Sequence, residues 1–303
     1  MKRVMLSVAL AAGLTMSGQA QTQPGPGGAG PTPQAPESAP VKGLKTPPAA
    51  KTQEEYNTFN SALTSVQGPD LAAGEAAARG FQAKFPQSEL TPQLYLSMLF
   101  KSLQENNGDK AIDMGREVLK LEPANPVAAV YVATVLAETT RETDLDASQK
   151  FDEAGQDAKV ALQNVDANLM MAAGVTQQQA DATKADLRAR AYDALGLVEL
   201  KRKNDAAAEK YLRQSVEIRG EPGDPMTHLR LALALDRENK YPEALAEARR
   251  SVALSQPDQS VAKSAQAEVD RLSKLTGSAG SASAPATAPA QAPPSQAVPP
   301  VPR

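Results

Sequence analysis

Apolar residues recur at spacings of three and four along most of the chain, and the pattern is clearest in the segment 229–257. Leu231 and Leu235 lie four positions apart, and Asn239 belongs to a polar interruption that follows them. A second periodic stretch begins near Pro242, since proline is well suited to the first turn of a helix. The segment therefore predicts two short helices folded back on each other.

The same unit returns earlier in the chain. Gly196 precedes Ala208 by twelve residues, as Ala232 precedes Ala244. A small residue at a helix contact lets two backbones approach closely, and a larger one would overpack the contact by about 1–3 kcal/mol. The corresponding positions of the earlier units are expected at Ala77, Phe81, Ala111, Pro123, Ala133, Ala154 and Ala161. One helix pair cannot bury both of its faces, so the units must stack.

This pattern of a small residue, twelve positions and a second small residue, with an apolar tail ending near proline, resembles the tetratricopeptide repeat (TPR), whose period is about 34 residues. About five units of uneven quality cover roughly residues 53–257, and Leu99 stands where a small residue is expected. The resemblance implies an all-α, right-handed solenoid of helical hairpins. Other helical-hairpin repeats would give nearly the same architecture. The amphipathic segment Ser260–Leu275 is expected to be its terminal capping helix.

Periodicity and capping signals also give helix boundaries. Thr176 followed by Gln179 is typical of a capping box, so a long helix is expected from there. The first hairpin should be anchored by buried Tyr56, Phe59, Leu63 and Phe81. The expected helices with explicit bounds are Gln53–Val66, Asp70–Lys84, Pro92–Leu103, Asp109–Leu121, Pro126–Ala137 and Gln177–Lys201. Leu169, Met170, Met171 and Val175 are expected to pack against the solenoid.

An acidic insertion interrupts the third unit after residue 137. Its aspartates briefly suggest a calcium loop, but Gln149 stands where the turn needs glycine and Gly155 stands where it needs glutamate. We therefore expect a solvated loop and no metal site. No cofactor is expected anywhere in the chain.

The two ends differ in composition from the periodic region. Lys2 and Arg3 precede an apolar run and small residues near Ala20, which is typical of an export signal. The run of about thirteen residues is short for a bilayer span, although an uncleaved anchor is the alternative. Absence of cysteine excludes a lipid-modified N-terminus. The predicted domains are a signal peptide (1–20), a disordered Pro/Gly-rich linker (21–51), the solenoid (52–275) and a disordered Ala/Pro-rich tail (276–303). The protein is expected in the periplasm or outside the cell, without a membrane span after cleavage.

The sequence contains few candidate catalytic residues. His228 is the single histidine, so no multi-histidine metal site can be formed, and it is expected to be a partly exposed packing residue. The net charge of −3 and 4% aromatic content disfavour nucleic-acid binding. A non-catalytic protein is predicted, with a hydrolase using an unrecognised carboxylate site as the alternative of another class.

In TPR proteins the first helix of each pair lines a concave surface that holds a peptide or helix of a partner protein. By this resemblance, the expected contact residues are Leu96, Phe100, Val130, Thr134, Arg190, Asp193, Leu197, Leu229, Arg230 and Leu233. The residues are mostly apolar, which disfavours the Lys/Asn clamp for a terminal carboxylate. The surface is either a groove for an amphipathic segment or a self-packed seam. The predicted function is an envelope interaction scaffold, with an outer-membrane assembly or secretion factor as the alternative.

Overall fold

The computed structural model describes residues 41, 43–257 and 259–282, with side chains to residue 277. This part of the chain contains eleven helices and no strand beyond one isolated bridge. The helices are α1 (Gln53–Gln67), α2 (Leu71–Lys84), α3 (Thr91–Gln104), α4 (Gly108–Leu121), α5 (Pro126–Thr139), α6 (Ala147–Asn164), α7 (Gln177–Lys201), α8 (Asp205–Arg219), α9 (Pro225–Arg237), α10 (Tyr241–Leu254) and α11 (Ser260–Ala282). The predicted all-α class is confirmed.

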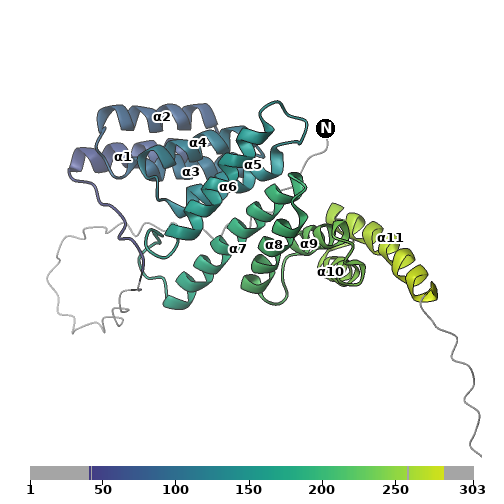
Figure 1. The fold of residues 1–303 in the computed structure, drawn as a ribbon. Helices are drawn as coiled ribbons and strands as arrows, with labels where there is room; N and C mark the ends of the chain where they lie inside the picture. The colour runs from purple at the N-terminus through teal and green to yellow at the C-terminus, as the bar shows by residue number, and fades with distance from the viewer. Residues whose placement is uncertain (1–40, 42, 258, 283–303) are drawn as a thin grey trace, which may run out of the picture.

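Helices that follow each other along the chain pack as hairpins, and the hairpins stack into an elongated solenoid (Figure 1). The first helices of neighbouring hairpins lie against each other: α1 against α3, α5 against α7, and α7 against α9. Long side chains bridge the second helices instead, as Arg116 of α4 does to Glu153 of α6 at 2.7 Å. We call the side of the stack formed by the first helix of each hairpin its inner side, and α3 and α5 meet there through side chains.

Small residues at the hairpin contacts decide how closely the two helices approach. A Cβ atom at Gly196 would lie 2.6 Å from Leu212 Cγ, so α7 and α8 pack in a way that only glycine permits. The second hairpin reverses this arrangement. Leu99 occupies the position where a small residue was expected, and Gly115 of the partner helix supplies the missing space. A Cβ atom at Gly115 would clash first with Val132 Cγ2 on α5 and would also lie 3.0 Å from Leu99 Cδ1, so a larger residue there would crowd both neighbours.

Two details of the first hairpin differ from the prediction. Phe59 and Phe81 are buried with ring centroids 5.7 Å apart, as expected, but Tyr56 is 48% exposed. The spacing of three placed Tyr56 on the same side of α1 as Phe59, but Tyr56 lies in the first turn, at the end of the helix. Ala78 is the fully buried small residue of α2, whereas Ala77 is only half-buried. The buried small residue of α2 is therefore Ala78, one position after the predicted Ala77.

The long helix α7 spans the predicted range and begins with the predicted capping box, in which Thr176 and Gln179 satisfy each other's backbone N–H groups. α11 continues through Ala282, seven residues past the expected end at Leu275. Residues 43–51, expected as part of a disordered linker, contact the folded domain through Lys45 and Leu44. The predicted signal peptide, the rest of the linker and the tail after residue 282 lie outside the described residues. None of the described helices is long and apolar enough to cross a membrane.

Candidate partner-binding surface

The residues predicted for the concave surface lie on the inner helices α3, α5, α7 and α9 and fall into two groups. Three of them are buried between helices: Val130 (0% exposed), Asp193 (8%) and Leu229 (7%). The other seven are half-buried: Leu96, Phe100, Thr134, Arg190, Leu197, Arg230 and Leu233. Only the second group retains surface that a partner could contact.

An aromatic pair joins α3 to α5 on this side. The rings of Phe100 and Tyr131 meet edge to face with centroids 5.0 Å apart, and the guanidinium of Arg190 lies 5.7 Å from the Tyr131 centroid. Burial raises the pKa of Tyr131, so its hydroxyl stays protonated at neutral pH. The sequence analysis chose Val130 and missed Tyr131. Helical spacing could have found it, because Val127, Tyr131 and Thr134 form one half-buried stripe.

The buried carboxylate of Asp193 ties α7 to α8 and α9. Asp193 accepts hydrogen bonds from the Thr227 hydroxyl at 2.9 Å and from the Arg219 guanidinium at 2.9 Å. Arg219 also lies 3.4 Å from Asp186, which accepts a 2.7 Å bond from Arg190. Arg219 was not among the predicted residues, because both of its carboxylate partners lie on another helix, α7. Asp186 was also missed, although its partner Arg190 follows it by four positions on the same helix.

Two more cations lie where α5 meets α7 and α9. The Lys201 ammonium donates to the carbonyl oxygens of Ala137, Glu138 and Thr140, which neutralises the carbonyl end of α5. Burial lowers the pKa of Lys201. Arg230 forms a 3.2 Å ion pair with Glu138. The charged side chains of this face are therefore largely paired with one another, and the half-buried Leu96, Leu197 and Leu233 lie among them.

Neither a family model nor a curated protein matches the sequence. Among solved structures, that of pilF from Pseudomonas aeruginosa is similar with a TM-score of 0.50 and 18% identity, covering 75% of this chain and 86% of that one. The chain has a TPR-type fold. MamA RS-1 is similar at a TM-score of 0.49 and 15% identity, covering 70% of this chain and 99% of that one. A TPR protein from Thermus thermophilus is similar at a TM-score of 0.43 and 15% identity, covering 71% of this chain and 98% of that one.

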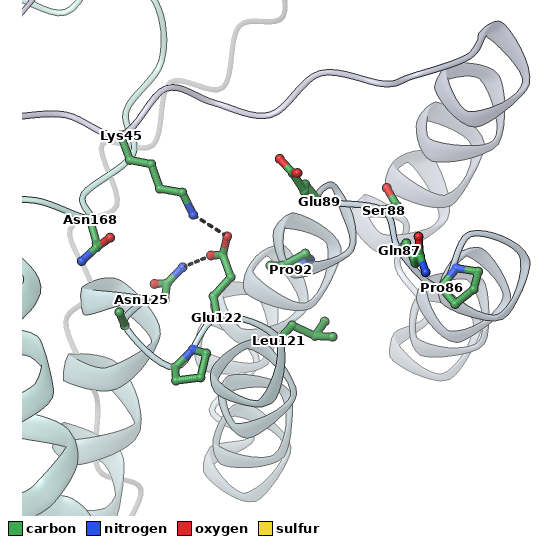
Figure 2. A pocket seen from close by; sticks show the side chains of 12 residues that line it. Lys45, Pro86, Gln87, Ser88, Glu89, Pro92, Leu121, Glu122, Asn125 and Asn168 are labelled. Carbon is green, nitrogen blue, oxygen red and sulfur yellow. Dashed lines mark hydrogen bonds and ion pairs between the residues drawn. The ribbon is translucent and has the colours of Figure 1, made fainter.

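A cavity of about 440 Å³ lies at the loops that connect the TPR hairpins, not among the predicted contact residues. Figure 2 shows Lys45 reaching across it to Glu122, with a distance of 2.9 Å between ammonium and carboxylate, and Asn125 donating to the same carboxylate at 2.8 Å. The lining residues are Lys45, Pro86, Gln87, Ser88, Glu89, Pro92, Leu121, Glu122, Pro123, Ala124, Asn125 and Asn168. Nothing in the sequence pattern pointed to this cavity, since its walls come from three separate loops and the segment before α1.

His228 differs from its prediction. The imidazole is 2% exposed, and its Nδ1 lies 2.6 Å from a carboxylate oxygen of Glu247 on α10. It was expected to be partly exposed, but α9 turns it toward α10, where the carboxylate compensates its burial. The described residues contain no group of three or more side chains that could hold a metal ion. In the described TPR stack, the inner surface thus offers apolar contact and paired charges.

Proposed function

We propose that the protein is a non-catalytic interaction scaffold that binds a peptide or helix of a partner protein on the inner surface of its TPR stack. The observation that carries this proposal is the set of half-buried apolar side chains on three of the inner helices: Leu96 and Phe100 on α3, Leu197 on α7 and Leu233 on α9. Helix surfaces exposing Leu and Phe at matched positions favour an amphipathic occupant.

The energetics favour this assignment over a purely polar contact. Each leucine that becomes fully buried against a partner contributes up to about 1.5–3 kcal/mol, and these side chains are already partly buried. The charge pairs nearby, such as Arg230 with Glu138, are already formed within the chain. They can orient a ligand without contributing much net affinity, because a partner must replace existing hydrogen bonds.

The test compares crosslinking in the intact cell envelope between the wild type and a Leu197→Lys, Leu233→Lys variant. Leu229 is unsuitable, because it is buried and a lysine there would disturb packing. The matched control is Ala206→Lys, Ala246→Lys, which adds the same two charges at exposed sites on the outer helices α8 and α10. A specific partner crosslinked to wild type and control but lost from the double variant is expected. Equal crosslinking of all three proteins would reject the inner surface.

We also propose that the protein is exported, on the basis of Lys2, Arg3 and the apolar run that follows them. Mass measurement of the mature protein is expected to show cleavage after Ala20. Fractionation without detergent separates two roles. A scaffold that acts in the periplasm is expected in the fraction without membranes, whereas an assembly or secretion factor would sediment with the membranes.

A further inference from the structure

The segment before α1 is tied to distant parts of the fold. We define residues 43–51 as the N-terminal strap. The backbone N–H of Lys45 donates to the carbonyl oxygen of Leu169 at 2.8 Å, and the same residue forms an isolated parallel bridge with Met170. Its ammonium pairs with Glu122 at the end of α4. The strap is therefore attached to the second hairpin and to the connection between α6 and α7.

The other end of the strap is fixed to the first hairpin. The N–H of Lys51 donates to the buried carboxylate of Glu55 at 2.6 Å. A hydrogen bond from Ser88, at the turn between α2 and α3, lowers the pKa of Glu55. Leu44 and Ala50 pack partly against the core near the two attachment points. Between them, Thr46, Pro47 and Ala49 are exposed to solvent.

We propose that the N-terminal strap is a releasable tie that fixes the first three hairpins relative to one another. In a solenoid, each unit normally contacts only its neighbours, so curvature depends on a series of local interfaces. A strap running from α1 to the α6–α7 connection adds a constraint across that series. Its attachments are few and partly exposed, so it opens at a lower free energy than the stack unfolds.

The close approach of the strap to the folded domain depends on Gly43. Gly43 has a φ of 75°, and a Cβ atom there would lie 2.9 Å from the carbonyl oxygen of Asp166 and 2.9 Å from Lys184 Nζ. Gly43→Ala should therefore displace the strap, and the only helix atom that it meets is the flexible end of Lys184 on α7. Gly220 is the control for backbone strain, because its φ of 62° and ψ of −158° are essentially closed to alanine and a Cβ atom there would meet nothing within 4 Å. Both substitutions impose the strain of positive φ, but only Gly43→Ala also places a Cβ atom against the residues that the strap contacts.

Two measurements on the full chain test the tie. The chain has no cysteine, so cysteines introduced at exposed Ala83 on α2 and Gln163 on α6 can carry the only spin labels. Gly43→Ala is expected to speed hydrogen exchange of the Lys45 amide about tenfold or more. It should also broaden the distance distribution between the labels. Gly220→Ala should leave both as in the wild type.

A second variant covers the case in which Gly43→Ala loses helicity. Lys45→Glu repels Glu122 at an exposed position, and Lys210→Glu on α8 is its charge control. Lys45→Glu is expected to speed the exchange of the residue-45 amide and to broaden the distance distribution between the labels. Lys210→Glu is expected to change neither quantity. Unchanged hydrogen exchange of the amide of residue 45 in the folded strap variants, after correction for the intrinsic rate of the new side chain, would overturn the proposal. So would faster exchange with an unchanged label distance, because the strap would then open without holding the hairpins. Neither result bears on binding at the inner surface.

Discussion

The hydroxyl of Thr227 on α9 donates to the carboxylate of Asp193 on α7 across 2.9 Å, and the two residues are separated by 34 positions, one TPR period. The bond therefore links one inner helix to the next at corresponding places in their units. Arg219 at the end of α8 completes the arrangement by donating to the same carboxylate. One buried acid holds three helices together.

Removing this acid should destabilise the fold more than removing an exposed one. Asp193→Ala leaves the Arg219 guanidinium, which is largely buried, without a main partner, and we expect a loss of about 2–4 kcal/mol in the free energy of unfolding. Asp181→Ala, at an exposed position on the same helix, should stay within about 0.5 kcal/mol of the wild type. Urea denaturation followed by circular dichroism measures both. Equal losses for the two variants would show that Asp193 has no special role.

Two glycines in helix interiors should respond to alanine with opposite signs. A Cβ atom at Gly155 of α6 would meet nothing within 4 Å, so Gly155→Ala should stabilise the protein by about 0.5–1 kcal/mol through helix propensity. At Gly196 of α7 it would lie 2.6 Å from the fully buried Leu212. Gly196→Ala should therefore destabilise it by about 1–3 kcal/mol.

Thermal and urea unfolding of the two glycine variants, measured together, provide the check. The same change in backbone entropy applies to both, so the difference between them reports the helix contact. A stabilising Gly196→Ala would mean that α7 and α8 can separate at little cost.

Stability should depend on pH through Asp157 on α6. Burial first and the nearby charge of Glu153 second raise its pKa to about 7, against an opposing effect of Arg116. The folded state then holds a proton that the unfolded state releases near pH 4, so this stabilising contribution is present at low pH and is lost as pH rises through about 7. Asp157→Asn should stabilise the protein at about pH 8.

The expected gain at about pH 8 is of the order of 1–2 kcal/mol, because a half-buried site retains only part of the full shift. At about pH 4 the variant and the wild type should be nearly equal. Urea denaturation at the two pH values measures the difference, and an NMR titration of the Asp157 carboxyl gives its midpoint directly. A gain of equal size at both values would assign the effect to packing.

The inner surface was only partly predictable from sequence. A periodic pattern places a residue on one side of its own helix, and neighbouring residues are about 100° apart around the axis. An error of one position therefore exchanges a buried residue for a half-buried one, as with Val130 and Tyr131. The resemblance to TPR repeats placed Leu197 and Leu233 on the inner helices, and their side chains are half-buried there.

The order of the helices and their pairing into a TPR-type stack could be read from the amino-acid sequence, because apolar period, small contact residues and caps are properties of short segments. The packing of Leu99 against Gly115, the network around Asp193 and the attachment of Lys45 to Glu122, 77 positions away, emerged only from the folded structure. Such contacts form when atoms of segments far apart in the sequence come within hydrogen-bonding or van der Waals distance. That distance depends on how whole hairpins stack, which no local pattern encodes.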